Sequence, residues 1–228
     1  MAGGFSGDLF DAPPGPGRRM HGTGPGPGKE RLMSRALFII DVQNDFTEGG
    51  ALGVDGGGDV ARGITRLLAA EPYRYDHVLA SRDWHEATGG NGGHFAPAGT
   101  VPDFSTTWPE HCVQGTAGAE YHPDLDVTAV DFHLRKGQGA PAYSIFEGTT
   151  EDGVPLADLL VLHDVTDVDV VGLATDYCVL ASALDAVHQG RRVRVLEDLV
   201  AGVAPATSTA ALERLRDAGA EIVSGPGD

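Results

Sequence analysis

Three residues that border apolar segments have side chains able to support nucleophilic catalysis together. Asp41 and Lys136 each end an apolar run, and Cys178 follows the apolar run 167–174. A thiol near the start of a helix is favoured as thiolate by the helix dipole and by a neighbouring ammonium group. A carboxylate beside them could accept the thiol proton and orient the lysine. Taken singly, each residue also fits an ordinary role, as a turn residue, a solvated charge or a small core side chain.

A second group of residues has the types and spacing of metal ligands. Asp83 and His85 lie two positions apart at the end of an apolar run, where both side chains of a strand point to the same side. His94 lies in a Gly-rich bend, and His111 ends a long polar segment. One carboxylate and three imidazoles suit one divalent metal ion, zinc, iron or manganese, with open positions for water or substrate. The alternative is that loops carry these histidines by chance.

An alternation of strands and helices must position these residues. Apolar runs predict strands at 36–41, 77–82, 131–136, 167–174, 192–197 and 221–224. Helical spacing predicts helices at 59–70, 155–162, 177–188 and 208–218, and a long loop is expected at 87–110. Apolar strands separated by helices indicate a three-layer α/β/α sandwich with a mainly parallel sheet. In such sheets, sites form outside the carboxyl ends of the strands.

The first 34 residues differ in composition from the rest of the chain. They contain nine Gly and five Pro and show no periodic apolar pattern. We therefore expect a disordered extension at 1–34 and one domain at 35–228. Codons for Lys29-Glu30 can form a ribosome-binding sequence shortly before Met33, so one hypothesis places the native start at Met33. A genuine disordered tail is the alternative.

The composition of the 228-residue chain argues against several classes of function. Lys and Arg number 16 against 33 Asp and Glu, a net charge of −17, so neither nucleic acid nor a membrane is an expected partner. No apolar run approaches the roughly 20 residues of a spanning helix, and no signal peptide is visible. The two cysteines, Cys112 and Cys178, are too few for a disulfide framework. A reduced, cytoplasmic protein is expected, and its oligomeric state, a homo-oligomer included, is left open.

Seven motifs between Arg35 and the C-terminus resemble those of the nicotinamidases of the isochorismatase-like hydrolase superfamily. In chain order they are Asp41-Val-Gln-Asn-Asp-Phe46-Thr-Glu-Gly-Gly50, Arg82-Asp-Trp-His85, Gly93-His-Phe95, Trp108-Pro-Glu-His-Cys-Val-Gln-Gly115, Arg135-Lys-Gly137, Ala142-Tyr-Ser-Ile-Phe146 and Gly172-Leu-Ala-Thr-Asp-Tyr-Cys178. As a set and in this order the motifs are specific.

The resemblance assigns roles to particular residues. It implies that Asp41, Lys136 and Cys178 form the catalytic triad and that the backbone N–H groups of Ala174 and Cys178 form the oxyanion hole. It also implies a cis peptide bond before Ala174. The implied ligands of the divalent metal are Asp83, His85, His94 and His111. The implied substrate contacts are Phe46, Leu52, Trp108, Tyr143 and Tyr177.

The activity implied by the resemblance is hydrolysis of nicotinamide to nicotinate and ammonia through a cysteine thioester, a step of NAD salvage. The metal would orient the pyridine ring of this small amide substrate. Tyr177 departs from the family pattern, because histidine is expected before the nucleophile in close relatives. Two alternatives keep the fold: a cysteine amidohydrolase acting on an N-carbamoyl, ureido or other small amide, and a non-catalytic protein that binds a metal or ligand.

Overall fold

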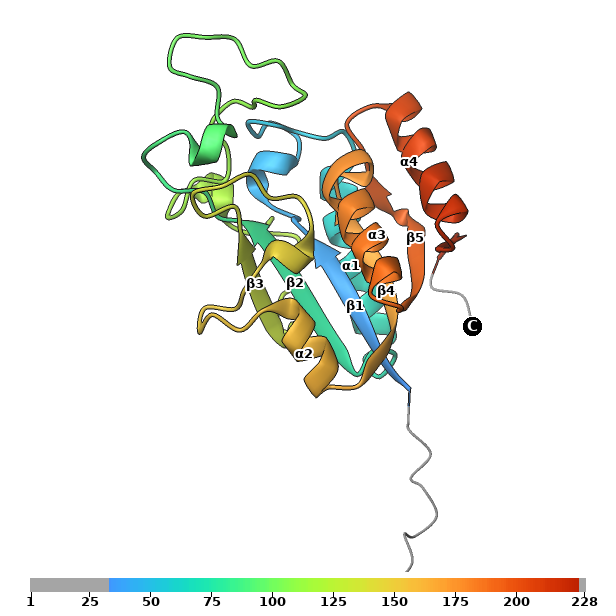
Figure 1. Cartoon of the computed structure of the whole chain (residues 1–228). Helices are drawn as coiled ribbons and strands as arrows, with labels where there is room; N and C mark the ends of the chain where they lie inside the picture. The colour runs from blue at the N-terminus through green and yellow to red at the C-terminus, as the bar shows by residue number, and fades with distance from the viewer. Residues whose placement is uncertain (1–32, 226–228) are drawn as a thin grey trace, which may run out of the picture. The chain divides into compact units, whose positions relative to one another are not determined.

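A six-stranded sheet forms the centre of the domain (Figure 1). This computed structural model describes residues 33–225, so the expected extension lies outside the described residues except for its last two positions. The strands are β1 (Ser34–Ile40), β2 (His77–Asp83), β3 (Phe132–Lys136), β4 (Val165–Leu173), β5 (Arg192–Ala201) and β6 (Glu221–Val223), in the order β3-β2-β1-β4-β5-β6. All neighbouring strands are parallel, which confirms the predicted mainly parallel sheet.

Strand β1 shows why the sheet needs helices on both faces. Its side chains alternate between two cores: Ala36, Phe38 and Ile40 belong to one, and Leu37 and Ile39 to the other. All five are fully buried. A strand that is apolar at every position can therefore bury all of its side chains only where both of its faces are covered.

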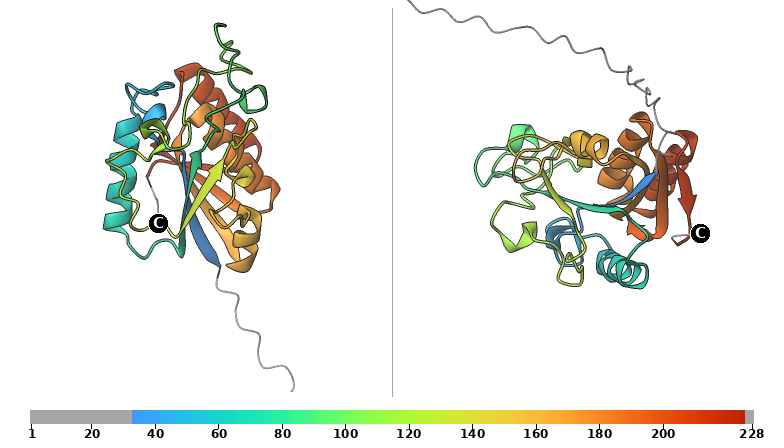
Figure 2. Two further views of the ribbon diagram at one scale, coloured as in Figure 1. Left: turned by 90° about the vertical axis from the view of Figure 1, so that its left-hand side faces the viewer. Right: turned by 90° about the horizontal axis from the view of Figure 1, so that it is seen from below.

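The helices supply that cover in two separate layers. Helix α1 (Gly57–Ala70) packs on the core that contains Leu37. The opposite core receives apolar side chains from α2 (Leu156–Leu162), α3 (Leu180–His188) and α4 (Pro205–Asp217). The left view of Figure 2 shows α1 on one side of the sheet and the orange and red helices on the other. This confirms the predicted three-layer α/β/α sandwich.

Two predicted elements differ most from those in the structure. The helix expected over 177–188 is a π-helical turn at Thr175–Val179 followed by α3, because the N–H group of Val179 donates to the Ala174 carbonyl at 3.1 Å. Strand β5 continues four residues beyond its predicted end. Its pairing with β4 shifts in register, and the strand continues beyond Glu197 and Asp198. In the sequence these two acidic residues indicated the end of the strand.

The loops that follow the carboxyl ends of the strands are long and mostly irregular. In the stretch predicted as a loop, 87–110, the only helical segment is the 3-10 turn Asn91–Gly93. This stretch is the green segment that stands above the sheet in Figure 1. No helix in the described part of the chain is long and apolar enough to cross a membrane.

Candidate active site

Four buried side chains meet where the central strands end, and we call them the cavity cluster: Asp41, Asp83, Lys136 and Cys178. Asp41 directly follows β1, and Asp83 and Lys136 are the last residues of β2 and β3. The ammonium Nζ of Lys136 lies 2.9 Å from Asp41 Oδ2 and 3.7 Å from Cys178 Sγ, and it also donates to Asp83 Oδ1. The structure thus brings together the three residues predicted for nucleophilic chemistry.

Burial and charge set the protonation of the cavity cluster. Burial raises the pKa of the Cys178 thiol well above its usual value, although Lys136 opposes the shift. Burial also raises the pKa of Asp41, against the pull of Lys136. The pKa of Lys136 lies well above its usual value, because Asp41 and Asp83 outweigh the cost of burying its charge. A neutral thiol therefore sits beside a carboxylate of raised basicity, and the thiolate expected from the helix dipole is not the resting form.

Two polar residues that sequence reasoning did not single out hold this cluster in place. The hydroxyl of Ser81 donates to Asp41 Oδ1 at 2.7 Å. The Gln43 side chain bridges two strand ends: its Nε2 donates to the Asp83 carbonyl at 2.9 Å, and its Oε1 accepts from the Asp83 N–H at 2.8 Å. Gln43 lies inside a quoted motif, but its role depends on the register between β1 and β2. That register is visible only in the folded sheet.

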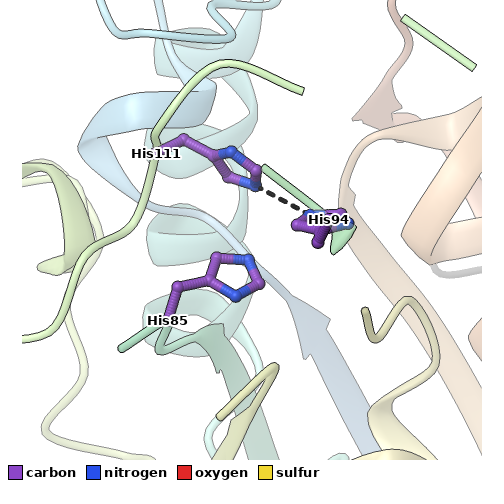
Figure 3. Close-up of side chains that lie close together, drawn as sticks. All are labelled: His85, His94 and His111. Carbon is purple, nitrogen blue, oxygen red and sulfur yellow. Dashed lines mark hydrogen bonds between the residues drawn. The ribbon is translucent and has the colours of Figure 1, made fainter. Parts of the chain in front are cut away.

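Figure 3 shows that three imidazole rings, those of His85, His94 and His111, converge on one point. His85, His94 and His111 are all buried and offer ligand atoms within 4.8 Å of one another. His94 Nε2 lies 3.4 Å from His111 Nε2, and the Oδ2 atom of Asp83 lies 3.6 Å from His85 Nε2 and 3.7 Å from His111 Nε2. The structure therefore brings the four residues predicted as metal ligands to one place.

Hydrogen bonds fix which nitrogen two of the three rings present. His85 Nδ1 donates to the Gly137 carbonyl at 2.7 Å, and His111 Nδ1 donates to the Pro109 carbonyl at 2.8 Å. In a neutral imidazole the lone pair is then on Nε2, and in both rings this atom faces the carboxylate of Asp83. Burial lowers the pKa of His94 to about 4, so this ring is neutral near pH 7.

Lone pairs that face a carboxylate in a buried space repel one another unless a cation lies between them. His85 Nε2 is buried and has no hydrogen-bond partner. Three imidazoles and one carboxylate form a donor set that suits a divalent metal such as zinc, iron or manganese. The residues present therefore fit the divalent metal that the sequence predicts.

Backbone pairing between distant segments positions the three rings. The N–H group of His85 donates to the Cys112 carbonyl at 3.0 Å, which places the segment of His111 beside the end of β2. His94 follows the turn Asn91–Gly93, and its carbonyl accepts from the Trp108 N–H at 2.9 Å. Gly137 has φ +79°, and a Cβ there would lie 2.5 Å from Cε1 of His85, so only glycine fits this approach.

A cavity of about 430 Å³ opens onto both groups of residues. Cys178, Asp83, His94 and His111 line it, and most of the remaining wall is apolar or aromatic. The five residues predicted to contact substrate all line this cavity: Phe46, Leu52, Trp108, Tyr143 and Tyr177. The lining residues that were not predicted include Phe104 and Val203, which lie in loops whose course the sequence does not reveal.

The wall around the nucleophile is held by aromatic contacts. The indole Nε1 of Trp108 donates to the hydroxyl of Tyr143 at 3.0 Å, and the rings of Trp108 and Tyr177 meet edge to face at 5.2 Å. Ala174 lines the same cavity, and the peptide bond before it is cis, as the resemblance implies. Tyr177, the departure from the family pattern, therefore forms part of the cavity wall.

The fold and this site define a cysteine-containing member of a known hydrolase family: residues 35–226 match the isochorismatase domain, and the chain belongs to that family. It is 51% identical over 189 residues to a nicotinamidase/pyrazinamidase of Mycobacterium tuberculosis, covering 83% of this chain and 98% of the relative.

Among solved structures, a zinc-bound pyrazinamidase of Pyrococcus horikoshii is similar, at 36% identity and TM-score 0.71, covering 84% of this chain and 99% of that one. Another similar structure is PnC1 from L. infantum in complex with nicotinate, at 35% identity and TM-score 0.70, covering 84% of this chain and 93% of that one.

Proposed function

We propose that this protein hydrolyses nicotinamide to nicotinate and ammonia through a thioester on Cys178. The observation that carries the proposal is the position of the Cys178 thiol. It is buried and lies 3.7 Å from the ammonium group of Lys136, which is itself paired with Asp41. The cavity at this thiol is also lined by side chains of the proposed metal site. The similarity to nicotinamidases supports the choice of substrate.

The first half of the reaction acylates the nucleophile. Cys178 Sγ attacks the carboxamide carbonyl while Asp41, whose pKa is raised by burial, accepts the thiol proton. The backbone N–H groups of Ala174 and Cys178 receive the negative charge that develops on the carbonyl oxygen. Asp41 then returns its proton to the departing ammonia, and the thioester remains on Sγ. Lys136 keeps its charge throughout and balances the carboxylates beside it.

The second half releases the acid. A water molecule attacks the thioester carbonyl as Asp41 accepts its proton, and the thiol of Cys178 is regenerated when that proton returns to sulfur. Asp83, His85, His94 and His111 would hold the divalent metal, which when bound supplies a Lewis-acidic position for the ring nitrogen of the substrate. Phe46 and Trp108 would flank the flat ring; both line the cavity.

The chemistry of the chain supports a neutral small molecule as partner. A net charge of −17 gives no attraction for nucleic acid or an anionic membrane, and a neutral amide needs no charge steering. Both cysteines are free and buried, in keeping with a reducing, cytoplasmic setting.

The test is ammonia release from nicotinamide by the purified full chain, with metal content determined on the same sample. Release with about one divalent ion per chain supports the proposal. An N-carbamoyl amino acid serves as the comparison substrate, because it reports the alternative amidohydrolase activity. Release from that compound but not from nicotinamide would overturn the assignment of substrate, and release from neither by fully metallated protein would overturn the amidase function.

A further inference from the structure

The cavity changes character from its floor to its mouth. The lining residues at the floor, Cys178, Asp83 and His94, are all less than a tenth exposed. At the opposite extreme, Phe104 is 53% exposed and Val203 is 57% exposed, although both line the same cavity. The chemical groups therefore lie at depth, and the mouth is apolar.

Phe104 is held at this mouth by a tightly bonded turn. Its φ of +55° is unusual for a bulky residue and places strain on the backbone. The turn compensates for that strain: Asp103 Oδ1 accepts from the N–H groups of Ser105, Thr106 and Thr107 at 2.8–2.9 Å. The ring of Phe104 meets that of Trp108 edge to face at 6.2 Å. The hydrogen bonds of the turn thus hold the backbone of Phe104, and the contact with Trp108 holds its ring.

Val203 is held in a different loop, the one between β5 and α4. Its N–H group donates at 3.0 Å to Oδ1 of Asp176, which lies in the same π-helical turn as Cys178. The Oδ2 atom of Asp176 accepts from the hydroxyl of Thr207 in α4. The loop that carries Val203 is therefore tied to the nucleophile's own turn.

We propose that Phe104 and Val203 determine specificity at the mouth and admit pyridine-3-carboxamides that carry a short alkyl group at ring position 5. This inference rests on the proposed function. Position 5 is meta both to the ring nitrogen and to the carboxamide carbon. When the ring nitrogen lies at the histidines and the carboxamide lies at Cys178, a group at position 5 points away from both. It therefore points toward the mouth.

The apolar mouth would shelter such a group from water. Full burial of a methylene group corresponds to about a fourfold gain in binding, and a half-open mouth provides about half of that free energy. For an ethyl group, the contact with Phe104 and Val203 together then amounts to roughly fourfold. We expect the 5-ethyl compound to be hydrolysed with a kcat/KM at least equal to that of nicotinamide.

The experiment compares 5-ethylnicotinamide with nicotinamide in the metal-loaded full chain and in the variants Phe104→Ala and Val203→Ala. The measured quantity is the ratio of the two kcat/KM values, so that a general loss of activity cancels. We expect the ratio to fall roughly threefold in Phe104→Ala and less in Val203→Ala. Val101→Ala is the matched control, because Val101 lies on the same loop and is 87% exposed but does not line the cavity. Its ratio should equal that of the wild type.

Two results overturn the inference: rejection of the ethyl compound by more than about tenfold in the wild type, or an unchanged ratio in Phe104→Ala.

The same compounds are also titrated into Cys178→Ala protein, with and without Phe104→Ala, by calorimetry. Absence of ammonia release from nicotinamide itself contradicts the proposed function. The ratio of the two dissociation constants still tests the mouth in that case, since it must shift in the same direction as the kcat/KM ratio.

Discussion

The cavity cluster can be compared with a second group of polar side chains, the sheet cluster of Tyr75, Asp169 and Arg194, in which Asp169 is buried and the other two are half-buried. Asp169 is 1% exposed and lies in the middle of β4. Its Oδ1 accepts from Arg194 Nε at 2.8 Å, and its Oδ2 accepts from Arg194 Nη2 at 2.6 Å and from the Tyr75 hydroxyl at 2.8 Å. The Asp169 carboxylate thus forms a bidentate pair with the Arg194 guanidinium, and Arg74 Nε lies 3.9 Å from its Oδ2 atom.

The cavity cluster has the opposite composition, with more carboxylates than cationic groups. Two carboxylates share one ammonium group, and the second carboxylate also faces imidazole lone pairs. A cavity opens onto this cluster and supplies room for a ligand. The comparison teaches that burial of charge alone does not mark a functional site. Surplus negative charge beside unpaired lone pairs and an open cavity does.

Replacing the lysine should produce the largest effect on both stability and activity. Lys136→Met keeps the volume of the side chain but leaves Asp41 and Asp83 without their shared cation. We expect the free energy of unfolding to fall by about 3 kcal/mol and turnover to fall by more than about a hundredfold. Chemical denaturation and ammonia release measure the two changes. A stability loss below about 1 kcal/mol would show that Lys136 does not balance these carboxylates.

Removal of the metal should come next in size. A ligand present at roughly 100 times its Kd stabilises the folded chain by about 2.7 kcal/mol, so a chelator should lower the Tm. His85→Ala protein should show the same Tm with and without metal, whereas the exposed His188→Ala should respond like the wild type. A wild-type Tm that does not change when divalent metal is added would contradict the assigned ligand set.

The sheet cluster should affect stability without affecting turnover. Asp169→Asn leaves the Arg194 charge partly buried without its carboxylate, and we expect a loss of about 2 kcal/mol in the free energy of unfolding. Ammonia release at 20 °C should remain within about twofold of the wild type, because Asp169 is remote from the lining of the cavity. A loss of activity comparable to that of Lys136→Met would remove the distinction between the clusters.

Removal of the ion pair Asp167–Arg192 should reduce stability less than removal of the pair Asp169–Arg194. It joins β4 to β5 with the same bidentate geometry two residues earlier, but the Arg192 side chain is 59% exposed. Asp167→Asn should therefore shift the Tm by no more than about 2 °C. Arg192 lowers the pKa of Asp167, so its carboxylate stabilises the fold above its usual pKa of 3.8, and this contribution is lost as the pH falls. The difference between variant and wild type should accordingly vanish as the pH is lowered from 7 to about 2.

The sequence predicted the parts of the site that follow from strand ends. Asp41 and Lys136 could be placed because the carboxyl ends of parallel strands meet at one edge of a sheet. The same reasoning placed Cys178, Asp83 and His85 there, and the resemblance to a known family then assigned roles to them and to His94 and His111. The length, order and apolar character of the strands were sufficient for the three-layer fold.

The remaining features depend on pairing that single-chain patterns do not encode. Register alone places Asp169 opposite Arg194 and Ser81 beside Asp41. The π-helical turn around Cys178 arises from a backbone bond between Val179 and Ala174, which has no side-chain signal. Phe104 reaches the cavity through a loop without periodicity, so only the folded chain reveals its place.

The central claim is that the thiol of Cys178 is the nucleophile of the cavity cluster. The most direct test is ammonia release from nicotinamide by metal-loaded Cys178→Ala protein, measured beside its Tm and its metal content. The substitution removes one sulfur atom, so metal content should be unchanged and the Tm close to that of the wild type. We predict a turnover below about one hundredth of the wild-type rate. Residual turnover clearly above that level in folded, metallated protein would contradict covalent catalysis by Cys178.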